Sequence, residues 1–240
     1  MSIKDDYYIK EINFTTAESV VIRCHYAHRH APYTHAYGLF SKELKRLVGV
    51  VIYGSPASHS LCESLCGFDE RYNIYELTRL YVDDGLPRNL ESYLVGNTIK
   101  MLDKEIIVSY SDTEYNHVGI IYQATNFYYT GITKSNSADF EGIDELGNRL
   151  HNKSLYDKYG DIEGIRKAIE NGANIYTKQR SKKHRYVYFN CNKRRKKELL
   201  AKLQERYEIL PYPKQDCPCP ITSTENITDY EKKQKKFFHI

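Results

Sequence analysis

The sequence predicts a mixed α/β domain in which a central sheet is flanked by helices, with a basic C-terminal extension. An apolar hairpin, "YTHAYGLFS" and "RLVGVVIYG", is followed by the order strand, helix, strand, helix, strand. One of the later strands, "EIIVSY", is continuously apolar rather than alternating, which is typical of a strand inside a sheet. Strands that alternate with helices indicate the α/β or α+β class.

The N-terminal part supplies a strand, a helix and the hairpin. "YYIKEI" is predicted to be the opening strand, and "TTAESVVIRCHYAH" a helix with Thr15 or Thr16 as N-cap and Glu18 near the capping-box position. The charged turn "KELK" joins the two hairpin strands. We expect the following stretch, "SPASHSLCESLCGFDERYN", to be a loop because it is rich in small and polar residues.

The middle of the chain has the layout of a site at a strand end. "IYELTRLYV" is predicted to be a strand with an outward Glu76, "DDGLPRN" a turn and "LESYLVGNTIKMLDK" an amphipathic helix. After "EIIVSY" come a Ser-Tyr-Ser-Asp cluster, a short helix that carries Tyr122 and a strand of alternating aromatic and small residues. This order suggests that an active site opens at the end of this strand.

The C-terminal part is polar and then basic. Residues 134–175 read as irregular apart from one helix, "DIEGIRKAIENG"; a strand, "HRYVYF", a basic helix, "NKRRKKELLAKLQERY", and a rigid turn, "PYPK", follow. We therefore expect a catalytic core over residues 1–135, a basic DNA-contacting extension packed on it over 136–214, and a flexible tail over 215–240.

Composition narrows the class of protein. The hydrophobic share of 41% supports a real core, and no apolar run approaches the roughly 18 residues that a membrane span requires. The first residues, "MSIKDDYYIKE", lack the apolar centre of a signal peptide, so we expect a cytoplasmic protein whose cysteines are reduced and which has no membrane partner.

Charge is unevenly distributed along the chain. Residues 176–206 hold twelve Lys or Arg and two Glu, a local charge of +10, although the whole chain carries only +4. One face is therefore expected to meet a polyanion, with double-stranded DNA the first candidate. A solvated helix face is the alternative for "KRRKK" alone, but basic and aromatic residues interleave just before it. The expected DNA contacts are Lys182, Lys183, His184, Arg185, Tyr186, Arg194 and Arg195.

Three further stretches are candidates for chemistry. Arg88, Asn89 and Ser92 begin a helix after a Gly/Pro turn and can hold a pyrophosphate, the alternative being an ordinary capped helix. Neither GxGxxG nor a Walker motif is present. "HYAHRHAPYTH" offers histidines as bases, metal ligands or stacking groups, or merely a polar loop. Ser109 and Asp112 end a strand, and Asp112 can cap the next helix, bind a ligand, or do both.

Cysteine spacing is only weak evidence for a metal. Cys62-x3-Cys66 and Cys217-x-Cys219 have the ligand type that zinc prefers, but they are far apart and no accompanying histidine pattern is present. The identity of any metal therefore stays unknown from the sequence.

Taken together, these spaced segments resemble the Mom family of phage DNA-modification proteins. The resemblance runs from about His25 to Lys214, through "LVGVVIYGSPAS", "YELTRLYVDDGLPRNLESYLV", "IIVSYSD…HVGIIYQATNFYYTG" and "KKHRYVYF…PYPK". It implies a GNAT acyltransferase-like fold and a phage-encoded transferase that places a carbamoylmethyl (acetamido) group on adenine N6 in DNA. That modification blocks host restriction enzymes.

The resemblance also implies roles for particular residues. Tyr122 corresponds to the tyrosine that protonates the CoA thiolate, and Leu80 and Val82 to the strand that holds CoA. "DDGLPRN" replaces the usual [RQ]xxGxG, so Arg88, Asn89 and Ser92 take the place of that pyrophosphate loop. The pair His25–Tyr26 and the residues Ser109 and Asp112 correspond to the pocket for an extruded adenine, with Asp112 or His25 as general base.

The resemblance leaves the donor open. Simple acyl transfer makes an amide on N6, whereas the family's product is attached through a methylene carbon. The candidate cofactors are acetyl-CoA or a related donor, and a metal ion such as iron. Two rival functions are a GNAT enzyme that acts on a small amine or a protein, and a DNA-binding anti-restriction factor without catalysis.

Overall fold

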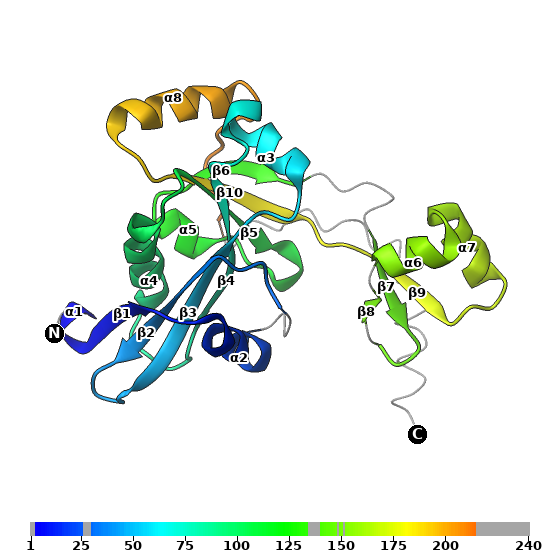
Figure 1. The fold of residues 1–240 in the computed structure, drawn as a ribbon, viewed down its shortest axis with the longest axis horizontal. Coiled ribbons are helices and arrows are strands. Elements are labelled where there is room, and N and C mark those ends of the chain that lie inside the picture. Colours follow the sequence, from blue (N-terminus) through cyan, green and yellow to red (C-terminus); the bar gives the residue numbers. More distant parts are fainter. Residues whose placement is uncertain (1–2, 26–29, 134–139, 148, 151, 215–240) are drawn as a thin grey trace. The chain divides into compact units, whose positions relative to one another are not determined.

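A computed structural model shows two compact units within the chain. The first consists of Met1–Ser111, His117–Ile132 and Lys183–Lys214, and the second of Asp112–Asn116, Thr133–Lys182 and Gln215–Ile240. Each unit is described by itself. The structure describes residues 3–25, 30–133, 140–147, 149–150 and 152–214 (Figure 1).

The first unit is built on a seven-stranded mixed sheet (Figure 1). The neighbours β1–β2, β2–β3, β3–β4 and β10–β6 pair antiparallel, and β4–β5 pairs parallel. This confirms the predicted mixed sheet. In spatial order the strands are β1 (Tyr7–Glu11), β2 (His35–Ser41), β3 (Arg46–Gly54), β4 (Ile74–Val82), β5 (Ile106–Asp112), β10 (Lys183–Phe189) and β6 (Tyr128–Ile132).

Helices cover both faces of this sheet because its side chains alternate between them. Val50 and Ile52 of β3 pack on α2, whereas Val51 and Tyr53 face the other way, toward α4. Ile74 lies in the cluster that α3 and α8 cover. The helical segments of this unit are α1 (Ile3–Asp6), α2 (Phe14–Cys24), α3 (His59–Cys66), η1 (Phe68–Glu70), α4 (Leu90–Thr98), η2 (Ile99–Met101), α5 (Ile120–Ala124) and α8 (Lys193–Gln204).

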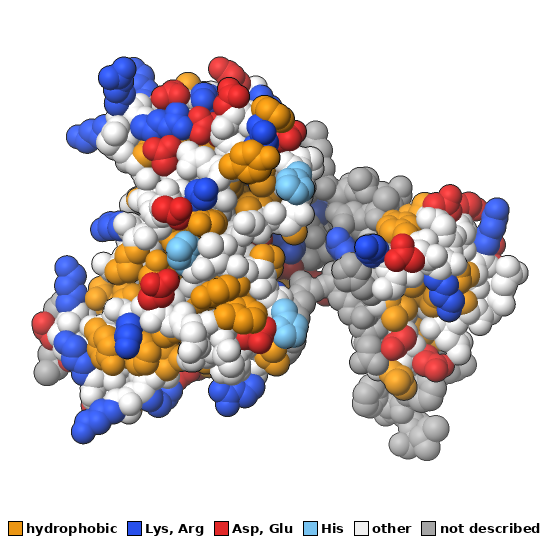
Figure 2. Space-filling model, viewed as in Figure 1, with side chains coloured by type: hydrophobic (Ala, Val, Ile, Leu, Met, Phe, Trp, Pro, Cys, Tyr) orange, Lys and Arg blue, Asp and Glu red, His pale blue; other side chains and the backbone are white. Residues whose placement is uncertain are grey.

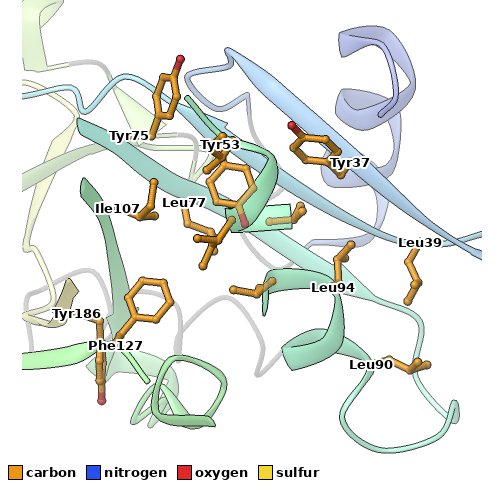
Figure 3. Close-up of a cluster of buried hydrophobic side chains, with 14 of the residues drawn as sticks. Tyr37, Leu39, Tyr53, Tyr75, Leu77, Leu90, Leu94, Ile107, Phe127 and Tyr186 are labelled. Atoms are coloured by element: carbon orange, nitrogen blue, oxygen red, sulfur yellow. The ribbon is translucent and has the colours of Figure 1, made fainter. Parts of the chain in front are cut away.

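The largest buried cluster lies between the sheet and the α4–α5 side (Figure 3). It is rich in tyrosine, and Tyr7, Tyr37, Tyr53, Tyr75, Tyr129 and Tyr186 are all buried in it. Tyr53 is fully buried, and its hydroxyl bonds to Thr98 Oγ1 at 2.8 Å. A buried hydroxyl requires such a partner.

Two local predictions in this unit were wrong. The N-cap of α2 is Asn13, whose side chain accepts from Thr16 N at 2.9 Å, rather than Thr15 or Thr16. The predicted loop over residues 55–73 contains α3, capped by Ser58. Its polar-looking sequence buries only one stripe, formed by Cys62, Leu65 and Cys66.

The longest segment of the second unit, Thr133–Lys182, is an insertion between the adjacent strands β6 and β10. Its small core contains Phe140, Leu155, Ile165 and Ile175. The predicted helix at 161–172 is present, but strands and a further helix replace the predicted irregular structure. The elements are η3 (Thr113–Tyr115), β7 (Phe140–Asp144), β8 (Arg149–Leu150), α6 (Asn152–Tyr159), α7 (Ile162–Glu170) and β9 (Ile175–Gln179).

The boundaries of these units differ from the expected division at residue 135. Because β10 pairs with β6 in the central sheet, Lys183–Lys214 belongs to the first unit and is not part of a separate extension. The expected tail over residues 215–240 lies outside the described residues. Within the part of the chain that is described, no helix has the length and apolar character needed to cross a membrane.

Candidate active site where two strands separate

The two parallel strands of the sheet pair only over their first halves. Ile74–Leu77 of β4 pairs with Ile106–Ser109 of β5, and β4 then continues to Val82 along β3 alone. The separation begins at a bulge, because Tyr53 faces Leu77 while its neighbour Ile52 faces Arg79. The extra residue is Thr78. A bulge re-aims a strand, so the second half of β4 is free to meet a ligand on its β5 side.

Serines close the inner end of this separation. Ser109 is fully buried and its hydroxyl donates to the carbonyl oxygen of Leu77 at 3.2 Å, across the last β4–β5 pair. Ser111 donates to the carbonyl oxygen of His117 at 2.6 Å. Ser109 thus holds the two strands together at the point from which they part.

Tyr122 is held beside the separation by a rigid approach to α5. Gly119 has a φ of 70°, and a Cβ there would lie 2.5 Å from the ring of Tyr186. The Tyr186 hydroxyl donates to the carbonyl oxygen of Val118 at 2.5 Å. The half-buried ring of Tyr122 packs on Tyr186 and Phe127, with centroids 5.3 and 5.4 Å away.

The turn after β4 leads to an open helix start. Asn89 adopts the left-handed conformation, with a φ of 71°, and makes no side-chain hydrogen bond as N-cap of α4. Ser92 donates to the carbonyl oxygen of Asn89 at 3.0 Å, and Arg88 is exposed. Leu80 and Val82 are partly exposed and lie against the same buried cluster as Tyr122. The first turn of α4 therefore begins without a side-chain hydrogen bond from Asn89 to its backbone amides.

The histidine-rich loop is tied to β4 at the bulge. Thr78 donates to the carbonyl oxygen of Pro32 at 3.1 Å, and Arg79 to that of His30 at 3.1 Å. His25 caps the end of α2 and is buried. Tyr26 lies outside the described residues.

The outer end of the same loop packs against β3. A Cβ on Gly54 would lie 2.3 Å from the Pro32 oxygen, so β3 and the loop are in close contact. Sequence reasoning missed Gly54 and Thr78 because a glycine at a strand end and a bulge leave no signal in a single sequence.

Asp112 belongs to the second unit. Its Oδ1 accepts from the amide of Glu114 at 3.0 Å, so the predicted capping role is confirmed for the 3₁₀ turn η3. Thr113 next to it donates to the carbonyl oxygen of Lys182 at 2.7 Å from its hydroxyl. Glu114 forms an ion pair with Lys178. These contacts fix the backbone that carries the Asp112 carboxylate.

The expected DNA contacts separate into buried and exposed groups. His184 and Tyr186 are buried, and His184 Nδ1 lies 2.8 Å from the Tyr129 hydroxyl. Burial lowers the pKa of His184. Alternation along β10 directs both side chains into the core, which corrects their expected place on the DNA surface. Lys182, Lys183 and Arg185 are partly exposed, and Arg194 is exposed.

Arg195 is engaged by three carboxylates. Its guanidinium contacts Glu70, Glu105 and Glu198 at 2.6, 2.9 and 2.6 Å. Burial raises the pKa of Glu70, but hydrogen bonds from Arg195 and Lys202 outweigh it and hold that pKa at about 2. Arg195 therefore anchors α8 to η1, which corrects its expected role as a DNA contact, whereas Arg194 points to solvent.

The model of the Mom protein family matches residues 6–214. The chain belongs to the Mom family. Among curated proteins it is 27% identical over 214 residues to the methylcarbamoylase mom of Escherichia phage Mu, covering 86% of this chain and 83% of that protein.

Solved structures similar to this Mom family chain are acetyltransferases. A ribosomal-protein-S5-alanine acetyltransferase from Vibrio fischeri has a TM-score of 0.43 at 10% identity, over 78% of this chain and 94% of that one. An N-acetyltransferase from Staphylococcus aureus Mu50 has a TM-score of 0.43 at 11% identity, over 78% and 99%.

A metal does not fit the described residues of this Mom family chain. They contain no group of three or more His, Cys, Asp or Glu side chains placed to hold an ion. Cys62 and Cys66 are buried thiols, and burial raises the pKa of Cys66 to about 12, which opposes the thiolate that zinc needs. Cys217 and Cys219 lie outside the described residues.

Proposed function

We propose that this protein is a transferase that modifies the N6 amino group of adenine in double-stranded DNA with a carbamoylmethyl-type group. Family membership and the phage Mu relative named a methylcarbamoylase support the reaction class. The observation that carries the proposal is the separation of β4 from β5 after Leu77. The unit that contains these strands also contains Tyr122, the start of α4 and the histidine-rich loop.

A CoA-type donor fits the separated strand and the open helix start. Arg88 and the amides of the first turn of α4 would hold the pyrophosphate, and Leu80 and Val82 the arm along β4. Gly85, at a φ of 77°, has nothing within 4 Å of a Cβ position, which leaves the turn open beside Arg88. When bound, such a donor would supply a small group as a thioester, whose direct transfer makes an amide on N6. A carbamoylmethyl product would instead require a donor whose leaving group departs from the methylene carbon that joins to N6.

The side chains supply and remove protons. Bond formation at N6 releases one N6 proton and the leaving group of the donor. We assign the N6 proton to His25 or Asp112 as general base, and the hydroxyl of Tyr122 as the acid that protonates the leaving group of the donor. Adenine N6 is conjugated and weakly nucleophilic, so the base has to be extruded for these groups to reach it. We propose that Tyr26 and Ser109 also belong to the adenine pocket. Ser109 would contribute by its hydrogen bond to the Leu77 carbonyl oxygen.

The proposed DNA-binding surface lies on α8 and the start of β10. Lys193, Arg194 and Lys197 are exposed, and Figure 2 shows lysine and arginine side chains gathered at the end of the first unit where α8 lies. Such cations neutralise phosphates and make binding dependent on salt. Lys183 and Arg185 extend the basic surface within the same unit.

The test is the mass of nucleosides from bacteria that express the protein. A gain in the mass of deoxyadenosine supports the proposal, and its size separates a carbamoylmethyl group from an acetyl group. The Tyr122→Phe variant should abolish the gain, while Tyr115→Phe, at an exposed tyrosine of η3, should retain it.

Other outcomes identify the rival functions. Unmodified deoxyadenosine together with newly acetylated protein or amine would identify an acyltransferase for other acceptors. Salt-sensitive DNA binding with every nucleoside unchanged, also when the other proteins of the source phage are co-expressed, would identify a binding protein. Protection of the expressed plasmid against restriction enzymes tests the biological role.

A further inference from the structure

A carboxyl group without a partner lies next to the separation of the strands. Glu76 precedes Leu77 on β4, and it is paired with Gly54 of β3 on one side and Val108 of β5 on the other. Within the described residues it makes no hydrogen bond and no ion pair. Because the residue is partly exposed, its carboxyl is open to a hydrogen-bond donor from outside the protein.

The surroundings of Glu76 belong to several elements. Alternation places it on the face of Ile74 and Val108, which α3 covers. Electrostatic coupling connects it with Tyr110 of β5 and Cys62 of α3. Burial raises the pKa of Glu76, and Lys183 and Arg79 lower it. The carboxyl is thus mostly enclosed by described side chains from four elements, yet the residue remains partly exposed and can be reached.

The other carboxylates of this face contrast with it. Glu70, also buried, is satisfied by Arg195 and Lys202. Lys183 and Arg79 both lower the pKa of Glu76, but neither residue forms an ion pair with it. A carboxylate that has polar neighbours but no hydrogen-bond donor among them is suited to accept hydrogen bonds from a ligand that carries an amino group.

We propose that Glu76 accepts a hydrogen bond from the N6 amino group of the extruded adenine and thereby distinguishes adenine from guanine. The inference rests on the proposed function and adds the residue that reads the substrate. Guanine presents a carbonyl oxygen at the corresponding position, which a carboxylate repels, and purine has no group there. Glu76 lies one residue from the point where β4 leaves β5, beside the strand that would hold the donor.

Duplexes with one unpaired central base test this role, because an unpaired base is extruded at little cost. The central base is adenine, purine or guanine, in several flanking sequences, and the dissociation constant is measured for each. Because a hydrogen bond to a charged group is strong, the native protein should bind the adenine duplex roughly 10- to 100-fold tighter than the purine duplex. Glu76→Ala should remove this difference, and Glu76→Gln, which keeps an acceptor oxygen, should retain part of it.

Controls separate this role from a structural one. Glu43→Ala changes an exposed carboxylate in the hairpin turn and should keep the full preference for adenine. Glu76→Ala removes no hydrogen bond that the structure shows, so its thermal unfolding should match that of the native protein. Equal binding of adenine and purine by the native protein, or an unchanged preference in Glu76→Ala, would overturn the inference.

The mass of the cellular nucleosides distinguishes this inference from the proposed function. Modified deoxyadenosine together with an adenine preference that does not depend on Glu76 refutes only the role of Glu76. A preference that depends on Glu76 in a protein that leaves nucleosides unchanged supports the adenine site and refutes the transfer reaction. Unchanged nucleosides without any preference refute both.

Discussion

The Glu70 network offers a stability measurement with a calculable size. Glu70 is 5% exposed and accepts hydrogen bonds from Arg195 and Lys202 at 2.6 and 2.7 Å. Its pKa falls from 4.5 to about 2, and each pKa unit corresponds to about 1.4 kcal/mol. The shift therefore sets an upper limit of roughly 3.5 kcal/mol, and because both cationic partners are partly exposed, we expect Glu70→Gln to cost about 2 kcal/mol at pH 7.

The pH dependence follows from the sign of this shift. A carboxyl whose pKa is lowered on folding stabilises the protein fully above its unfolded pKa, near 4.5. It loses that contribution as the pH falls through about 2. Urea unfolding at a series of pH values should show the native protein and Glu70→Gln converging below about pH 4. Glu198→Gln, at a carboxylate 52% exposed that contacts the same two cations, should cost less than about 1 kcal/mol.

Two results would refute this reasoning about Glu70. One is a Glu70→Gln protein as stable as the native one at pH 7. The other is a loss of stability of the same size at pH 7 and pH 3, because a cavity or a local rearrangement, rather than the ion pairs, would then be responsible.

Three further predictions concern other parts of the first unit. Arg194→Ala should weaken DNA binding and reduce the slope of log K against log salt by about 1 without changing the unfolding temperature, as salt titrations will show. Gly54→Ala should displace the loop at Pro32, costing about 1–3 kcal/mol in urea unfolding and most of the modification activity, because the new Cβ would overlap the loop backbone. Tyr186→Phe should cost about 0.5–1.5 kcal/mol in the same assay, since it removes one of two donors to the Val118 carbonyl oxygen and leaves Gln123 Nε2 as the other.

The sheet was largely predictable because its strands have strong local signals. The range of β4, 74–82, and both hairpin strands were predicted with the bounds that the structure shows or nearly so. Apart from the helix at 161–172, the second unit was not, because its small core draws on isolated apolar residues, such as Phe140 and Leu155, within polar segments. A short amphipathic stripe of this kind is hard to distinguish from irregular structure.

The candidate site was predictable in its elements but not in its geometry. Sequence order placed Tyr122 after a strand and Asp112 as a cap, and the cap is confirmed. The bulge at Thr78 depends on the register between two strands, and the isolation of Glu76 depends on the absence of contacts. Neither is a property of one segment. The burial of Tyr186 similarly follows from the pairing of β10, which a basic, aromatic segment does not reveal.

The insertion between β6 and β10 also affects how the chain is synthesised. The ribosome synthesises Ile132, the last residue of β6, about fifty residues before Lys183, the first residue of the partner strand β10. Until then Val108 and its neighbours in β5 lack the cover of Val187 and Leu199. Early compaction of the inserted segment would shorten the effective loop that joins the two strands and so reduce the entropy lost when they pair. Nascent chains stalled before and after Lys183 should therefore differ sharply in protease resistance.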